Sequence, residues 1–265
     1  MHWQPDPNLR SIPKLYGLIG YPLSHSFSRK YFSEKFAREG IPDSQYELFP
    51  IENIERFPEL LAAFPNLHGL NVTIPYKQQI IPFLDSLDES AAAVGAVNVI
   101  KFSGTQLIGY NSDVFGFESS LLSFLQENCA TPGHALILGT GGAAKAVVFV
   151  LQKLKIPYSI ASRQPLDGQM SYEEVHANIE RYPLIINTTP LGMAPKVESC
   201  PDLPYHQLKQ GHLLYDLVYN PESTEFMQRG LAQGLPVKNG LEMLYGQAEK
   251  AWEIWNTPAA PSANH

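Results

Sequence analysis

The sequence has little cysteine, and its cysteines stand in no functional spacing. Only Cys129 and Cys200 occur among the 265 residues, and neither belongs to the paired spacing of a metal or redox motif. The eight histidines show no zinc pattern either. These absences exclude a disulfide-stapled secreted fold, and we expect two unpaired thiols in a reducing compartment and no bound metal.

The sequence also lacks a block of like charge, a long apolar run and a short internal repeat. Its formal net charge is −7, without acidic or basic clusters, so we expect neither nucleic acid nor a membrane surface as a partner. No window approaches the length of a membrane span. The polar stretch from Met1 to Arg10 has no apolar core of signal-peptide length. We therefore expect a cytoplasmic protein.

Hydrophobic residues make up 44% of the chain and charged residues 17%, which describes a globular protein long enough for two domains. Apolar runs of strand length alternate with stretches of helical spacing, so the expected fold class is α/β. The expected strands cover residues 14–20, 46–51, 68–74, 96–102, 106–110, 135–138, 158–161, 184–187, 213–218 and 235–238. The expected helices cover residues 27–39, 54–64, 90–94, 114–127, 143–154, 225–233 and 241–255, with one more that holds Lys77 in its first turn.

The most informative stretch is a strand, a glycine turn and a helix between Ala135 and Ala146. Gly139, Gly141 and Gly142 follow a four-residue apolar strand and precede a helical pattern. One glycine lets the strand turn sharply, and another lets the backbone approach a pyrophosphate without an intervening side chain. The helix then directs its free N–H groups and its positive dipole end at the anion. The stretch predicts a dinucleotide-binding unit.

The end of the next strand bears on the choice of dinucleotide. An NAD-specific unit usually has an acidic residue about twenty positions after the glycines, where it binds the ribose 2′-hydroxyl. This chain has Ser162 and Arg163 there. A hydroxyl and a guanidinium would bind a 2′-phosphate, which a carboxylate would repel, so the sequence favours NADP.

Polar residues also follow the strands of the first half. Ser26 and Ser28 follow the first strand at a spacing of two residues. Either could simply cap the next helix. Hydroxyls at this spacing also suit a ligand with several oxygens, because alternate residues of an extended segment face the same way.

Further along, Asn71 and Thr73 are polar positions of an apolar strand, and Lys77 follows at its carboxyl end. Open α/β sheets bind their ligands at that end. Asn98 interrupts another strand, and Asp113 follows the hairpin after it. Asp113 alone could be a helix cap, but together with Lys77 and Asn98 it indicates one polar site.

With these segments placed, the chain resembles the shikimate dehydrogenases, NADP-dependent enzymes of the aromatic amino-acid pathway. The resemblance runs from Tyr16 to Ala248 and keeps the family's motifs in order. The motifs are Ser24-His25-Ser26, Asn71-Val72-Thr73-Ile74-Pro75-Tyr76-Lys77, Gly95-Ala96-Val97-Asn98, Gly109-Tyr110-Asn111-Ser112-Asp113, the glycine turn, Asn187-Thr188-Thr189-Pro190-Leu191-Gly192-Met193, Asp216-Leu217-Val218-Tyr219-Asn220-Pro221, and Gly240 with Met243 and Gln247-Ala248.

The resemblance implies a two-domain α/β fold with a cleft between the domains. Residues 1–112 and the helix 241–256 would form an α/β substrate domain. Residues 113–240 would form a Rossmann-like, doubly wound NADP-binding domain, and residues 257–265 a disordered tail. The resemblance leaves monomer and homodimer open.

The resemblance also implies the site residues. Lys77 and Asp113 would be the catalytic pair. The substrate's carboxylate and hydroxyls would be bound by Ser24, Ser26, Thr73, Asn98, Asp113 and Gln247, with Tyr219 nearby. The NADP-binding positions would be Gly139, Thr140, Gly141, Gly142, Ala143, Ser162, Arg163, Thr188, Val218, Gly240 and Met243.

The pair has a chemical rationale, because oxidation of an alcohol requires a group that takes the hydroxyl proton while hydride leaves for the nicotinamide. In the reductive direction a charged lysine would polarise the carbonyl. The implied reaction is the reversible reduction of 3-dehydroshikimate to shikimate with NADPH, in chorismate and aromatic amino-acid biosynthesis.

Two alternatives stay open beside this reading. The first is a quinate/shikimate dehydrogenase of the same family that uses NAD, for which an acid after the second nucleotide-domain strand would be better evidence. The second is a non-catalytic sensor of a shikimate-like ligand, which would be expected to lose Lys77 or Asp113 first. The chain departs from the family where Ser162-Arg163-Gln164 replaces the common Asn-Arg-Thr and where Tyr76 replaces phenylalanine.

Overall fold

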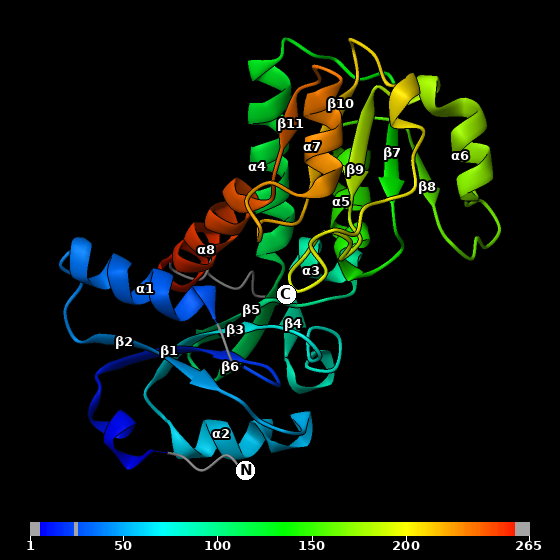
Figure 1. Cartoon of the computed structure of the whole chain (residues 1–265). Helices are drawn as coiled ribbons and strands as arrows, with labels where there is room; N and C mark the ends of the chain where they lie inside the picture. The colour runs from blue at the N-terminus through cyan, green and yellow to red at the C-terminus, as the bar shows by residue number, and fades with distance from the viewer. Residues whose placement is uncertain (1–5, 24–25, 258–265) are drawn as a thin grey trace. The chain divides into compact units, whose positions relative to one another are not determined.

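A computed structural model describes residues 6–23 and 26–257 of the chain. Ser24 and residues 258–265 of the expected tail lie outside the described residues. The chain divides into two compact units (Figure 1). The first unit contains the residues up to Ser112 and those from Ala248, and the second contains Asp113–Gln247. Within the described residues, no helix is long and apolar enough to cross a membrane.

The first unit is built on a mixed six-stranded sheet in the order β2-β1-β3-β5-β6-β4. Strands β1, β2 and β3 run parallel, whereas β5 pairs antiparallel with β3 and with β6. The carboxyl ends of β1 and β3 therefore meet at one edge of the sheet. The strands are β1 (Lys14–Ile19), β2 (Ser44–Phe49), β3 (Leu67–Val72), β4 (Ser86–Leu87), β5 (Val99–Ser103) and β6 (Gln106–Tyr110).

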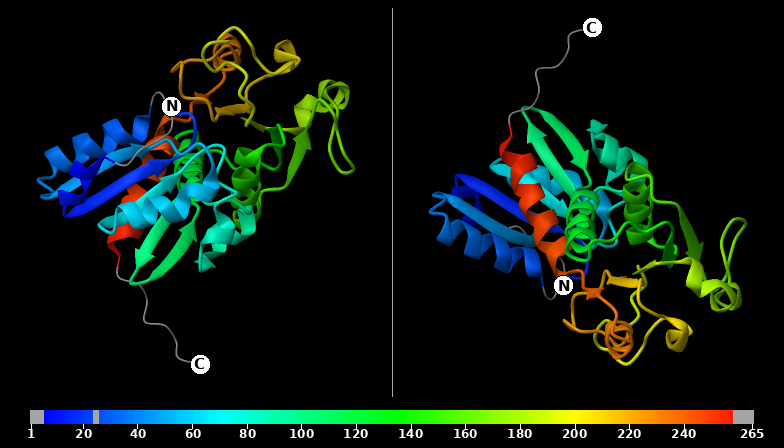
Figure 2. Two further views of the ribbon diagram at one scale, coloured as in Figure 1. Left: turned by 90° about the horizontal axis from the view of Figure 1, so that it is seen from below. Right: turned by 90° about the horizontal axis from the view of Figure 1, so that it is seen from above.

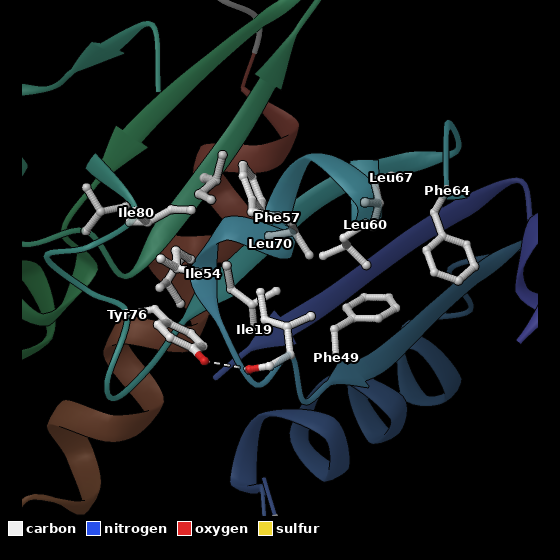
Figure 3. Packing of buried hydrophobic residues seen from close by; sticks show 14 of the residues in the cluster. Ile19, Phe49, Ile54, Phe57, Leu60, Phe64, Leu67, Leu70, Tyr76 and Ile80 are labelled. Atoms are coloured by element: carbon white, nitrogen blue, oxygen red, sulfur yellow. Dashed lines mark hydrogen bonds between the residues drawn. The ribbon is translucent and has the colours of Figure 1, made fainter. Parts of the chain in front are cut away.

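Helices cover both faces of this sheet because β1 alternates its apolar side chains. Leu15 and Ile19 face a cluster that includes Phe57 and Leu60 of α2 (Figure 3). Tyr16 and Leu18 face a second cluster formed with α1 and α8. The helices and short 3-10 turns are η1 (Pro7–Ser11), α1 (Phe27–Arg38), η2 (Ile54–Arg56), α2 (Phe57–Ala63), η3 (Ile81–Phe83), α3 (Glu89–Val94) and α8 (Leu241–Asn256).

Helices α1 and α8 lie side by side on the second face (Figure 2). The ammonium of Lys35, almost fully buried, is 2.8 Å from the Glu249 carboxylate of α8 and 2.9 Å from that of Glu39. Trp255 packs on Gly69, where any Cβ would collide with the indole ring. Its Nε1 donates to the Ile100 carbonyl at 3.1 Å. The end of α8 is thus an integral part of the first unit.

The second unit is a parallel five-stranded sheet in the order β11-β10-β9-β7-β8. Side chains of α6 and α7 cover one face. On the other face, Tyr215 of β10 packs edge-on against Phe117 and Phe124 of α4 and donates to Ser120 Oγ at 2.8 Å. The elements are α4 (Ser112–Glu127), β7 (Ala135–Leu138), α5 (Gly142–Lys153), β8 (Tyr158–Ala161), α6 (Tyr172–Asn178), η4 (Ile179–Arg181), β9 (Leu184–Asn187), η5 (Tyr205–Gln207), β10 (Leu213–Asp216), α7 (Glu225–Ala232) and β11 (Val237–Lys238).

Several expected boundaries are wrong. The strand expected at 46–51 is β2 at Ser44–Phe49, and β3, β5 and β10 are shorter than expected. The helix expected around Lys77 does not form, and residues 74–80 make a turn instead. Ile80 N donates to the Tyr76 carbonyl in one helical turn, but Pro82 has no N–H with which to continue the ladder.

Candidate functional site

Ser26 stands at the start of α1 and has a structural task. Its hydroxyl oxygen accepts from the Arg29 backbone N–H at 3.4 Å, as an N-cap does. A hydroxyl that accepts at a cap keeps its proton for a second partner. Ser26 therefore caps α1 and still has a donor for a ligand oxygen.

Thr73 and Lys77 follow the carboxyl end of β3. Thr73 N donates to the Ile19 carbonyl at 2.9 Å, which closes β3 against β1. The Lys77 carbonyl accepts from Val97 N at 2.7 Å. The turn that carries Lys77 is therefore bound to Val97, the residue just before Asn98. The fold thus brings the predicted site residues Lys77 and Asn98 to one edge of the first sheet.

Tyr76 fixes the same turn from the inside (Figure 3). Its ring is buried, and its hydroxyl donates to the Ile51 carbonyl at 2.6 Å. Burial raises the pKa of Tyr76, with the charge of Glu52 adding to the effect. The Tyr76 hydroxyl thus points into the core and anchors the residue next to Lys77.

Asn98 is buried and forms a compact set of hydrogen bonds to the start of α4. Its Oδ1 accepts from Ser112 N at 2.7 Å, and its Nδ2 donates to Ser112 Oγ at 3.0 Å. Asn98 does not interrupt a strand as expected, because β5 begins only at Val99. Helix α4 begins at Ser112, so Asp113 lies inside the first turn and is not the N-cap.

Asp113 and Gln247 lie on two helices that cross at close range within the second unit. At Gly116, one turn after Asp113, an added Cβ would collide with the Met243 carbonyl and would lie 2.9 Å from Gln247 N. Only a glycine allows this approach. The crossing therefore places the turn of α8 that carries Gln247 against the turn of α4 that follows Asp113.

The glycine turn after β7 has the predicted form. Gly139 has a φ of 106°, in the region that favours glycine, and an added Cβ would lie 2.9 Å from Thr188 Oγ1. Thr188 Oγ1 donates to the Leu138 carbonyl at 2.7 Å. Gly139 and Thr188 thus hold the ends of β7 and β9 together.

Gly141 and Gly142 differ from Gly139, because neither the backbone conformation nor the packing requires glycine at these two positions. Neither has a positive φ, and an added Cβ would meet no atom of the described residues within 4 Å. Among the same residues, no side chain caps the N-terminus of α5, which begins here. Exposed N–H groups beside an open glycine surface suit a phosphate group. Thr140 and Ala143 are exposed at the same turn.

Ser162 and Arg163 follow β8 as predicted. Ser162 is half-buried, whereas Arg163 is exposed. The Ser162 hydroxyl accepts from Gln164 N at 3.2 Å and is 3.1 Å from the Gln164 carbonyl. Burial raises the pKa of Tyr172, and the charge of Arg163 opposes that rise. Arg163 is the stronger of the two candidates for an anion.

A buried polar network at the ends of β9 and β10 was not predicted. Asp216 is fully buried and accepts from Asn187 Nδ2 at 2.9 Å, Val218 N at 3.0 Å and Thr224 Oγ1 at 2.6 Å. Burial raises the pKa of Asp216 to about 6, although these donors lower it. The network fixes the loops that carry Val218 and Tyr219. The signal in the sequence is a polar residue at the end of each apolar run.

Gly240 and Met243 occupy packing positions. Gly240 N donates to the Val218 carbonyl at 3.1 Å, and an added Cβ would collide with the Leu217 carbonyl. The Met243 carbonyl covers Gly116. Tyr219, by contrast, is 41% exposed and its ring is accessible to a ligand.

Comparison with known proteins finds relatives in one family. A family model described as the shikimate dehydrogenase substrate binding domain matches residues 18–100. The shikimate dehydrogenase (NADP(+)) of Geobacillus kaustophilus is 35% identical, with 92% of this chain and 93% of the relative covered. That of Clostridium beijerinckii is 37% identical, with 91% and 92% covered. The chain belongs to the shikimate dehydrogenase family.

Solved shikimate dehydrogenases have the same fold. The structure of shikimate 5-dehydrogenase from Thermus thermophilus in complex with NADP(H) and shikimate matches with a TM-score of 0.76. Its sequence is 28% identical, and the match covers 91% of this chain and 93% of that chain. The expected α/β class with a Rossmann-like nucleotide unit is confirmed.

The Asp216 network predicts an unusual pH dependence of stability. The folded state raises the pKa of Asp216 from 3.8 to about 6, so protonation of this carboxyl favours folding. The contribution is full below about pH 3.8 and is lost as the pH rises through about 6. In Asp216→Asn, the amide oxygen still accepts from Asn187 and Val218, and the amide N–H donates to Thr224 Oγ1. Between about pH 4.5 and 7.5, wild type should lose about 2 kcal/mol of unfolding free energy relative to the variant.

Urea unfolding of both proteins across this pH range measures the difference, in which the titration of all other carboxyl groups cancels. Parallel pH profiles for wild type and Asp216→Asn would contradict the assignment.

Proposed function

We propose that this chain is a shikimate dehydrogenase that catalyses the reversible NADPH-dependent reduction of 3-dehydroshikimate to shikimate, in chorismate and aromatic amino-acid biosynthesis. One observation supports this proposal most strongly. The chain is 35% identical to the shikimate dehydrogenase (NADP(+)) of Geobacillus kaustophilus, with 92% of its length covered, and it has both Lys77 and Asp113. A sensor without catalysis would have no need for this pair.

The residues of the second unit fit NADP. The open surface of Gly141 and Gly142 and the uncapped start of α5 suit the pyrophosphate. The exposed Arg163 suits the 2′-phosphate, since a guanidinium binds phosphate in two-pronged fashion. Gly139, Thr188 and Gly240 act indirectly, by holding the backbone of the surrounding loops. When bound, NADP supplies or accepts the hydride.

Lys77 and the polar residues predicted with it supply substrate binding and proton transfer. Ser24, Ser26, Thr73, Asn98, Gln247 and Tyr219 bind the carboxylate and hydroxyls of the substrate. In the reductive direction the Lys77 ammonium donates a hydrogen bond to the carbonyl oxygen and gives it a proton as the hydride reaches the carbon. In the oxidative direction Lys77 takes that proton back. Asp113 accepts a hydrogen bond from a substrate hydroxyl and holds it toward Lys77.

Initial rates of the purified protein test the proposal directly. We expect rapid reduction of NADP when shikimate is the substrate. The rate should be lower when quinate replaces shikimate or when NAD replaces NADP. The absorbance of the reduced cofactor measures each rate. The alternative, a quinate/shikimate dehydrogenase that uses NAD, is supported if NAD with quinate gives the highest kcat/KM. Binding of shikimate without any turnover would support the sensor instead.

Replacement of Lys77 tests the catalytic assignment. Lys77→Ala should lower kcat by about 10²- to 10⁴-fold, the usual contribution of a general acid–base group. Shikimate should still bind, because the remaining polar residues are intact. Calorimetric titration measures binding, and stopped assays measure turnover. Lys14→Ala, at an exposed lysine of β1, is the matched control. Unchanged turnover in Lys77→Ala would rule out this role.

Replacement of Arg163 tests the choice of cofactor. Arg163→Ala should raise KM for NADP about tenfold, the scale of one lost charge-assisted hydrogen bond. KM for NAD, which has no 2′-phosphate, should stay within about twofold. Arg181→Ala, at an exposed arginine elsewhere in the second unit, should change neither. An equal loss with NADP and NAD would contradict contact with the 2′-phosphate.

A further inference from the structure

Tyr46 is a buried residue of the first unit that the proposed chemistry does not use. It lies in β2, is 1% exposed, and stacks on Phe32 with ring centroids 4.7 Å apart. A phenylalanine would fill the same space with no polar atom to bury. The hydroxyl group therefore calls for a separate explanation.

The Tyr46 hydroxyl orients a side-chain amide. It donates to Asn71 Oδ1 at 2.7 Å, which leaves Asn71 Nδ2 facing the Asn98 carbonyl at 3.2 Å. With the amide reversed, Oδ1 would face another carbonyl oxygen, and that contact is repulsive. The same Asn98 carbonyl accepts from Val72 N at 2.9 Å. Tyr46 thus fixes Asn98 through the buried Asn71.

The network continues to the residues with proposed roles in binding. Asn71 is two residues before Thr73, and Asn98 is itself a proposed substrate ligand. The Asn98 side chain hydrogen-bonds both the backbone N–H and the hydroxyl of Ser112, and Asp113 is the next residue in the chain. Every link between Tyr46 and Ser112 is made by groups that are at least nine-tenths buried.

The Tyr46 ring also packs on α1, the helix that Ser26 caps. Phe32, on which Tyr46 stacks with ring centroids 4.7 Å apart, belongs to α1. Burial raises the pKa of Tyr46. Tyr46 therefore contacts α1 through its ring and β3 through its hydroxyl bond to Asn71.

We propose that Tyr46 is a positioning residue for the substrate: its hydroxyl, through Asn71, sets Asn98 and the end of β3 in the geometry that binds the carboxylate and hydroxyls. The proposal rests on the proposed function for its ligand. Tyr46 touches neither substrate nor cofactor. Without its hydroxyl, Asn71 Oδ1 is left buried with no donor, and the amide rotates away from Asn98 to find one.

Tyr46→Phe tests the proposal, with Tyr16→Phe as the matched control. Tyr16 is buried in the same aromatic cluster and contacts Trp255 as Tyr46 does. In the part of the chain that the structure describes, the Tyr16 hydroxyl makes no hydrogen bond. We expect Tyr46→Phe to raise KM for shikimate about tenfold, with kcat and KM for NADP each within about threefold. Tyr16→Phe should leave all three constants unchanged.

A double-mutant cycle with Asn71→Ala tests the route. If Tyr46 acts through Asn71, the double variant should have the shikimate KM of Asn71→Ala alone, because the link is already broken. Multiplicative effects of the two changes would overturn the proposal. An unchanged shikimate KM in Tyr46→Phe would overturn it too, as would a parallel rise in both Michaelis constants, which indicates general loosening.

Amide hydrogen exchange reads the same geometry without any turnover. Val72 N and Ser112 N donate to Asn98, so both should exchange at least about tenfold faster in Tyr46→Phe than in wild type. Phe64 N, at the end of α2, should not change. An inactive wild type with this pattern would refute the proposed function and leave the positioning role standing, whereas uniform exchange would refute the positioning role.

Discussion

The geometry of the first unit depends on a single buried asparagine that must satisfy all of its polar groups. Asn98 is 3% exposed, and an unpaired amide at that depth would cost several times what one hydrogen bond contributes. Its backbone N–H donates to the Tyr110 carbonyl, and its own carbonyl accepts from Val72 N. Its side chain binds Ser112. One residue therefore ties β3, β6 and the start of α4 together.

The same constraint acts at the strand ends of the second unit, with a carboxylate in place of the amide. Asp216 has no contact with solvent, and three donors from Asn187, Val218 and Thr224 surround it. Thr224 also caps α7 by accepting from Met227 N. In both units a buried polar side chain next to an apolar strand joins segments far apart in the chain.

Local chemistry decided which features could be predicted from the sequence. The glycine turn was predicted, because a sharp turn needs glycine wherever it occurs. Helix α6 was missed, although Ser171 and Glu174 form a capping box that the sequence displays. The helix at Lys77 was predicted wrongly, because Pro82 has no N–H with which to continue the single turn that forms there. The Tyr46–Asn71 and Asn187–Asp216 bonds join residues 25 and 29 positions apart, and such pairs follow only from the strand order.

The glycines show how the structure refines a motif that the sequence treats as uniform. Gly139 is required by its positive φ, and Gly240 by the backbone of Leu217, against which a Cβ would collide. Both would be glycine in a protein that bound no nucleotide. Gly141 and Gly142 have ordinary φ angles and open space where a side chain would stand. The fold leaves room for a side chain at both positions, so we propose that their glycine identity serves a molecule that approaches the backbone from outside.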